Sequence, residues 1–521
     1  MTAFSVRGCP GRQCGGLMTV SVTTLTRPVQ NTETQPEITR RQRPFGASVG
    51  LWMWPTLATL AIAMLRINGP ELGTDELVTW DAGHRSMGRI LAMLHNVDAV
   101  HSTYYVLMHG WMAVFGDSET AMRMPSALAM SATAALVALI GRRLFGPRAG
   151  MCGGMLFALI PIVSRFAQEA RSYALVVLAA TLATFLLLRA LDMPRRWWRW
   201  AGYALCVAVI GLLHLVALTV LAGHCVAVVR RARQEGRVLW CFCLAALAGA
   251  AGVIPVVVLG TSQASRQLFW VPEPDVWGLA DIWPELFASA LCAGVVITLA
   301  AMACTCTERR DALLLCGTMA VLPPFVLWAA SHGDVSYFRF QYAMFTVPAW
   351  TVLAGAGLAR ATRSWLSVAV ALTVLGLLVL PDQRRMRAEF EHDVPHNADY
   401  KAAARTIEKF YRPGDAAVFV KGAPWMLDQG VRYYLRPGPE LREVFVAESA
   451  AENNELFPVY CPVPATCLRG ESRIWVVVPG NDPDPLNTVP ANQAEALRAQ
   501  YATTGTVRLS GLTVALLERM P

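Results

Sequence analysis

Long apolar runs alternate with short polar loops between residues 50 and 381 of this chain. Each run holds few acidic residues and approaches the ~20 apolar residues that cross a bilayer as a helix. The pattern predicts about eleven transmembrane helices. They are expected at Leu51–Ile67, Met122–Ile140, Gly150–Val163, Tyr173–Leu188, two short spans within 201–229 that meet at His214, Val238–Leu259, Pro284–Ala303, Ala312–Ala330, Tyr342–Leu358 and Trp365–Leu380.

Arginine clusters between the runs set the expected orientation, because cytoplasmic loops carry an excess of Lys and Arg. The clusters within 142–148, 195–199 and 230–237 are therefore expected inside, together with a polar, disordered N-terminus over 1–49. The loop over 68–120 is then external. An apolar stretch from His101 to Phe115 is short for a span, and we interpret it as an interfacial or re-entrant helix within that loop. Interpreting it as a span would invert the orientation of every later span and place the arginine clusters outside.

Residues 382–521 lose the long apolar runs and are expected to form a small extracytoplasmic α/β domain. Strands are predicted at Ala416–Val420, Ile474–Val478 and Val507–Leu509, and helices at Ala402–Tyr411 and Ala494–Tyr501. Cys461 and Cys467 could close a disulfide in an oxidising compartment, and two free thiols are the alternative. A loop with Trp270, Trp277 and Trp283 is expected on the external interface.

Composition agrees with a membrane protein. The chain is 55% hydrophobic and 16% charged, with a mean hydropathy of +0.40, whereas soluble domains are nearer 45–50% apolar and about 25% charged. The net charge of +8 comes largely from the arginine clusters between apolar runs. That placement favours a role in membrane orientation over nucleic-acid binding. We expect a multi-pass protein of the plasma membrane.

The adjacent carboxylates Asp75 and Glu76 are the first candidates for chemistry, because they follow a predicted span directly. Charged side chains are costly in hydrocarbon, so such a pair is either solvated or kept for function. The alternative is a solvated helix start with Thr74 as N-cap.

Other polar residues lie at predicted outer ends of spans, and each has a plainer alternative. Arg123 could grip a phosphate or be a snorkelling anchor. Gln168, Glu169 and Arg171 could contact a substrate or form a polar turn. Tyrosines at the interface could belong to an aromatic belt. The candidates for substrate binding are His101, Tyr104, Tyr105, Arg123, Gln168, Glu169, Arg171, Tyr173, His214 and Arg339.

Several short motifs occur in an order that points to one family. They are DELVTWDA (75–82), HSTYYVLMHGWMAVFG (101–116), AMRMPSALAM (121–130), GRRLFG (141–146) and QEARSYAL (168–175). In these motifs the chain resembles the GT-C glycosyltransferases that use polyprenyl-phosphate-linked sugars, specifically the protein O-mannosyltransferase and aminoarabinose-transferase superfamily and its actinobacterial cell-wall relatives.

The resemblance implies a multi-spanning GT-C module over 50–381 with its catalytic loop at 68–120. It implies Asp75 as general base, with Glu76 supporting it, in an inverting transfer to a cell-envelope glycan, glycolipid or protein on the outer face. Mannose is the first expectation for the sugar and arabinofuranose the second. No cofactor is assigned, and participation of a divalent cation is left open. A transporter or flippase and an inactive scaffold are the rival functions; no internal repeat of the kind transporters show was found.

Overall fold

The computed structural model describes residues 49–388, 398–420 and 426–521. The predicted disordered N-terminus lies outside this range, except for residue 49. Up to residue 388 the described chain is built from helices, where η marks a short 3-10 helix. They are α1 (Val49–Met64), α2 (Thr74–His84), α3 (Met87–Asn96), η2 (Ala99–His101), α4 (Ser102–Phe115), α5 (Glu119–Phe145), α6 (Pro147–Leu159), α7 (Pro161–Ala167), α8 (Tyr173–Asp192), α9 (Trp197–Leu213), η3 (Leu215–Thr219), α10 (Val220–Ala232), α11 (Arg237–Ala251), α12 (Ile254–Gln267), α13 (Val276–Phe287), α14 (Ala290–Ala303), η4 (Thr307–Arg309), α15 (Arg310–Ala330), η5 (Phe340–Thr346), α16 (Val347–Ala361), α17 (Trp365–Leu378) and α18 (Leu380–Arg385).

These helices make the chain a helical membrane protein. Within the described residues, five helical segments are long and apolar enough to cross a membrane, and three bent pairs of helices meet the same criteria together. Three shorter apolar helices, α1, α9 and α17, lie where spans were predicted. The exact number of eleven spans stays a prediction.

Three predicted single spans are wrong in shape, because each is a bent pair. The pairs α6–α7, α11–α12 and α13–α14 bend by 65°, 59° and 96°. Pro161 and Pro255 stand at the starts of α7 and α12, where proline lacks the N–H of a continuous helix and disfavours helical backbone before it. Ala288 breaks the third pair in the left-handed region, with φ of 51°. Trp277 and Trp283 consequently lie in α13 and not in a loop.

Small residues allow the central helices to pack closely. A Cβ on Gly150 of α6 would lie 2.3 Å from the Ala138 carbonyl oxygen of α5. A Cβ on Gly355 of α16 would lie 2.4 Å from the Gly153 nitrogen of α6. Membrane helices associate largely through such close contacts, because lipid supplies no hydrophobic driving force between them. The close packing fixes α5, which carries Arg123 near its N-terminal end.

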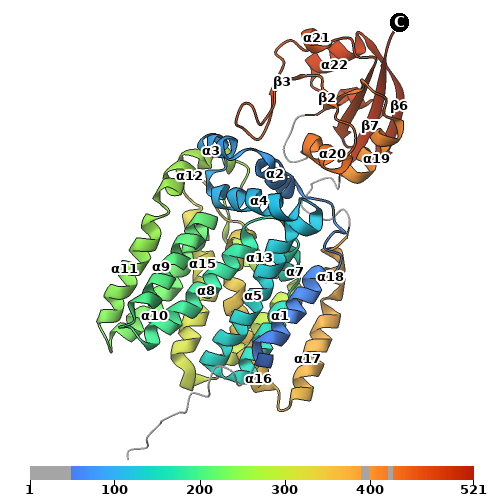
Figure 1. Ribbon diagram of the computed structural model, residues 1–521. Helices are drawn as coiled ribbons and strands as arrows, with labels where there is room; N and C mark the ends of the chain where they lie inside the picture. Colours follow the sequence, from blue (N-terminus) through green and yellow to red (C-terminus); the bar gives the residue numbers. More distant parts are fainter. Residues whose placement is uncertain (1–48, 389–397, 421–425) are drawn as a thin grey trace, which may run out of the picture. The chain divides into compact units, whose positions relative to one another are not determined.

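The helices α2, α3 and α4 lie across one end of the long helices (Figure 1). α4 is the helix predicted within the first loop, and it buries Tyr104, Tyr105, Met108 and Met112. Its separate position beside α2 and α3 agrees with the loop interpretation.

The C-terminal part forms the predicted small α/β fold. Its elements are α19 (Tyr400–Phe410), β1 (Ala416–Phe419), α20 (Leu427–Leu435), β2 (Arg442–Glu443), β3 (Val446–Glu448), β4 (Val459–Tyr460), α21 (Pro464–Cys467), β5 (Arg473–Pro479), η6 (Pro485–Asn487), α22 (Ala491–Arg498), β6 (Tyr501–Leu509) and β7 (Leu512–Arg519). Five strands form one sheet in the order β2-β1-β5-β7-β6. β1 runs parallel to β5, with Val418 opposite Val476, and β7 runs antiparallel to β5.

Two details of this part bear on the predictions. Cys461 and Cys467 form the expected disulfide, with Cα atoms 6.6 Å apart. The predicted helix Ala494–Tyr501 is wrong at its end, because α22 stops at Arg498 and Tyr501 begins β6, where it pairs with Arg519 of β7.

Candidate functional site

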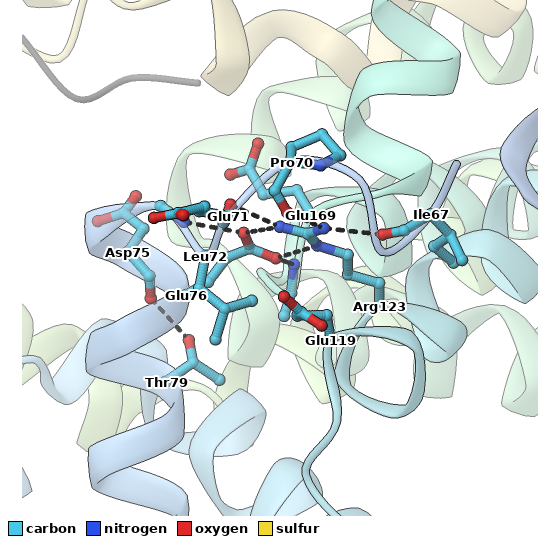
Figure 2. Close-up of polar contacts among 12 residues, drawn as sticks. Ile67, Pro70, Glu71, Leu72, Asp75, Glu76, Thr79, Glu119, Arg123 and Glu169 are labelled. Atoms are coloured by element: carbon cyan, nitrogen blue, oxygen red, sulfur yellow. Dashed lines mark hydrogen bonds and ion pairs between the residues drawn. The ribbon is translucent and has the colours of Figure 1, made fainter. Parts of the chain in front are cut away.

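The two adjacent carboxylates of α2 have opposite surroundings. The Asp75 side chain is 54% exposed, whereas that of Glu76 is 2% exposed. Successive helical residues point about 100° apart, so one can face solvent while the next faces the core. Figure 2 shows Glu76 turned toward Arg123 and Asp75 turned away from it.

Glu76 and Arg123 form a fully buried ion pair. The Arg123 Nε donates to Glu76 Oε1 at 2.8 Å and Nη2 donates to Oε2 at 2.7 Å. The remaining Arg123 donors go to the carbonyl oxygens of Ile67, Pro70 and Glu71, at 2.7, 2.9 and 3.0 Å. A guanidinium has five N–H groups, and all five are used here.

This arrangement differs from the phosphate-binding role expected of Arg123 and from the supporting catalytic role expected of Glu76. Arg123 has no donor left for a phosphate, and it is 0% exposed. Glu76 also accepts from the backbone N–H groups of Gly73 and Ala170. Burial would raise the pKa of Glu76, but Arg123 and these donors outweigh it and hold that pKa below its usual range. The pair holds the loop before α2 through these contacts.

Arg171 occupies the position expected of an anion-binding residue. Its side chain is 7% exposed, and its Nε lies 3.4 Å from Asp75 Oδ2. Nη1 donates to the Tyr105 hydroxyl and Nη2 to His101 Nε2, both at 3.3 Å. These contacts are long for charge-assisted hydrogen bonds. A phosphate oxygen could displace or join them, which it could not do at Arg123.

His101 presents a free donor beside Arg171. Burial, aided by Arg171 and His214, lowers the pKa of His101 well below its usual value, so the ring is neutral at pH ~7. Because Nε2 accepts from Arg171, the ring proton lies on Nδ1. That nitrogen is buried and has no protein partner within the described residues. A buried donor without a partner is costly, and a bound ligand would satisfy it.

Asp98 completes this cluster and was not among the predicted site residues. It adopts the left-handed region, with φ of 57°, which Asp tolerates better than most residues. Its carboxylate accepts from the Tyr105 hydroxyl at 2.6 Å and from Gln267 at 2.9 Å. Burial raises the pKa of Asp98, against the opposing effect of Arg171. Asp98 thereby orients Tyr105 toward Arg171.

A second group of predicted residues lies near this cluster. His214 packs against two aromatic rings, with its ring centroid 4.6 Å from that of Tyr342 and 5.9 Å from that of Tyr173. The Arg339 guanidinium lies 5.2 Å from the Trp270 ring centroid. His214 Nδ1 and Arg339 Nε are buried without a hydrogen-bond partner in the part of the chain described. Tyr342 belongs to this group and was not predicted.

The structure places three other candidates in contacts within the protein, and their binding role stays a prediction. The Gln168 amide donates to the carbonyl oxygens of Ala63 and Leu65, at 2.6 and 2.8 Å, and so ties α7 to α1. Glu169 pairs with Arg165 at 4.0 Å. Tyr104 is fully buried in the core between α2 and α4. Across residues 49–388, 398–420 and 426–521, no group of three or more His, Cys, Asp or Glu is placed to hold a metal ion.

Comparisons with known proteins agree with the predicted resemblance. A family model described as dolichyl-phosphate-mannose-protein mannosyltransferase matches residues 103–258. No curated protein gives a significant match. Among solved structures, ArnT from Cupriavidus metallidurans bound to undecaprenyl phosphate is similar with a TM-score of 0.58 and 15% identity, over 90% of this chain and 98% of that chain. Its apo state is similar with a TM-score of 0.54 at the same identity and coverage.

An archaeal oligosaccharyltransferase, AglB from Archaeoglobus fulgidus in complex with an inhibitory peptide and a dolichol-phosphate, matches with a TM-score of 0.46 and 11% identity, over 89% of this chain and 74% of that chain. The fold is similar to that of ArnT. The predicted resemblance to GT-C glycosyltransferases is confirmed, and the predicted enzyme class stays a prediction.

Proposed function

We propose that this protein transfers a sugar from a polyprenyl-phosphate donor to an acceptor hydroxyl, with inversion at the anomeric carbon, on the outer face of the plasma membrane. The observation that carries the proposal is the exposed Asp75 carboxylate, 3.4 Å from the buried Arg171. The pair belongs to a fold similar to that of ArnT bound to undecaprenyl phosphate. The acceptor is a cell-envelope glycan, a glycolipid or a protein.

Asp75 is the general base in this proposal. The acceptor oxygen attacks the anomeric carbon and its proton passes to the Asp75 carboxylate. The bond between the anomeric carbon and the phosphate oxygen breaks, and the lipid phosphate leaves with the electron pair. A single displacement needs one base and inverts the configuration, with no covalent enzyme intermediate. Asp75 suits this role because it is accessible, unlike Glu76.

Arg171 and His101 stabilise the leaving phosphate. Arg171 is held in place by Tyr105, which Asp98 orients in turn. The His101 Nδ1–H supplies a second, neutral donor. Fixed donors aimed at developing negative charge lower the barrier, because they need little reorganisation during the reaction. Tyr173, His214 and Arg339 border this group and contact the rest of the donor or the acceptor.

Mannose is the first choice for the donor sugar, supported by the description of the matching family model. Arabinofuranose is the alternative. A transporter or flippase remains the rival class. Purified protein in lipid nanodiscs, incubated with radiolabelled polyprenyl-phosphate-mannose or polyprenyl-phosphate-arabinose and a panel of glycan, glycolipid and peptide acceptors, tests the proposal. We expect transfer with inverted linkage; movement of intact donor across liposomes without transfer would support the rival.

The external placement of the site rests on the arginine-rich loops between spans. It predicts that a tag on the C-terminus is accessible to a membrane-impermeant reagent in intact cells. A cytoplasmic C-terminus would contradict both the orientation and an outer-face reaction.

A further inference from the structure

The segment from Ile67 to Leu72, just before α2, is held from two sides. On the side of the long helices, Arg123 donates to the carbonyl oxygens of Ile67, Pro70 and Glu71. Figure 2 shows these bonds converging on the loop beside Glu76. Asp75 follows Leu72 by three residues, in the first turn of α2. The direction of this segment therefore sets where the Asp75 carboxylate lies.

On the other side, the segment is held by the C-terminal helices. The Leu72 N–H donates to the Tyr434 hydroxyl of α20 at 2.8 Å, and that hydroxyl donates to Glu119 at 3.2 Å. Lys401 of α19 pairs with the same Glu119 carboxylate at 2.9 Å. The Tyr434 hydroxyl thus joins the backbone before α2 to the start of α5.

Glu71 makes a second connection. Its side chain accepts from the backbone N–H groups of Tyr400 and Lys401, at 2.8 and 3.1 Å, in the first turn of α19. Helix N-termini favour such acceptors, because their first N–H groups have no partner within the helix. Glu71 is 8% exposed, and burial together with Asp399 raises its pKa to about 8. A carboxyl group that stays buried although burial disfavours its charged form indicates a specific contact and not a chance surface contact.

We propose that the C-terminal domain positions the catalytic base, with Tyr434 and Glu71 as the positioning residues that hold the start of α2 against Arg123. This inference rests on the proposed function of Asp75. In this inference the C-terminal domain is part of the active site, because the direction in which α2 starts sets the distance between Asp75 Oδ2 and Arg171 Nε, which is 3.4 Å. The plainer possibility is that these contacts only stabilise the fold.

Two neighbouring tyrosines of α20 separate these explanations. Tyr434→Phe removes the hydroxyl that receives the Leu72 N–H. Tyr433→Phe is the matched control, because it also removes one hydroxyl from α20, but that hydroxyl donates to the Asp117 carbonyl oxygen at 3.0 Å and not to the segment before α2. We expect Tyr434→Phe to lower kcat about tenfold, the size expected from one lost hydrogen bond, with KM for the donor unchanged. Tyr433→Phe should keep kcat within about twofold.

The decisive readout is a double-mutant cycle with Asp75→Asn. If Tyr434 acts through Asp75, Tyr434→Phe has no further effect on the residual turnover of Asp75→Asn. A purely structural contact would lower both backgrounds by the same factor. Wild-type kcat in Tyr434→Phe, or equal losses in both backgrounds, would overturn the inference.

Failure of the proposed function gives a different result, because the wild type would then transfer no sugar. If only the role of Asp75 is wrong, Asp75→Asn keeps normal turnover. Should Tyr434→Phe not fold, Glu71→Gln carries the same cycle, since its amide can accept only one of the two N–H groups of α19. Additive losses for Glu71→Gln would equally reject the positioning role.

Discussion

Replacing Glu76 by Gln should mainly destabilise the protein, although Glu76 is adjacent to the proposed base. Each Glu76 oxygen accepts two hydrogen bonds. Oε1 accepts from Arg123 Nε and Ala170 N, both at 2.8 Å, and Oε2 accepts from Arg123 Nη2 at 2.7 Å and Gly73 N at 3.1 Å. A Gln side chain keeps one of these oxygens and turns an NH2 group toward two donors. It also leaves the Arg123 charge buried without a counter-ion.

Breaking a buried pair from one side costs about 3–5 kcal/mol, because the remaining charge loses both its partner and its water. The pKa of Glu76 is lowered in the folded protein, so this stabilisation is present above its ordinary pKa of 4.5 and is lost as the pH falls below that value. We therefore expect Glu76→Gln to unfold at a clearly lower temperature than the wild type at neutral pH, and the difference to shrink in acid.

The assay is thermal unfolding in detergent, followed by intrinsic tryptophan fluorescence. Asp75→Asn is the matched control, because it makes the same chemical change one residue earlier, at a side chain that is 54% exposed. Because Asp75 is half exposed, its ion pair with Arg171 is expected to contribute about 0.2–1 kcal/mol, so Asp75→Asn should destabilise the protein less than Glu76→Gln. Equal unfolding temperatures for Glu76→Gln and the wild type would refute the assignment of Glu76 and Arg123 as a buried structural pair.

Two further predictions concern the C-terminal part. Folding raises the pKa of Glu71 to about 8, so the stabilising contribution of Glu71 is complete below its ordinary pKa of 4.5 and is lost as the pH rises through about 8. Unfolding temperatures measured from pH ~6 to ~9 should therefore fall in the wild type and fall less in Glu71→Gln. Parallel curves for the two proteins would contradict this assignment. Replacing Cys461 and Cys467 by Ser should destabilise this part by ~2–3 kcal/mol, because their bond closes a short loop. Mass spectrometry without reduction should find the linked peptide, and quantitative alkylation of both thiols in native membranes would exclude the bond.

Apolar length predicted the helices well, because any segment that crosses lipid must be both long and apolar. It could not predict the bend at Ala288, where the backbone turns by 96° within the segment expected to be one straight span, Pro284–Ala303. That turn depends on a left-handed residue and on the Ser289 cap of α14, which hydropathy does not report.

The candidate site was predicted only in part, because contacts between distant segments are also not visible in the sequence pattern. His101 and Tyr105 were expected and do contact Arg171, which in turn pairs with Asp75. Which of Asp75 and Glu76 is exposed depends on which face of α2 meets the core. The hydrophobic periodicity of this short helix is too weak to predict that face.

The contacts of Arg123 could not be predicted either, because the groups that accept all of its hydrogen bonds lie 47 to 56 residues earlier in the chain. Asp98 was missed because its importance comes from a left-handed backbone and from Gln267 of α12, which lies far away in sequence.

Turnover of Asp75→Asn tests the central claim most directly. The substitution keeps the shape of the side chain and removes its basicity, and general-base catalysis contributes about 10²–10⁴-fold. We predict that single-turnover transfer from radiolabelled donor falls by that order, while donor affinity and unfolding temperature stay near those of the wild type. Near-normal turnover in a preparation shown to be folded would contradict the assignment of Asp75 as the catalytic base.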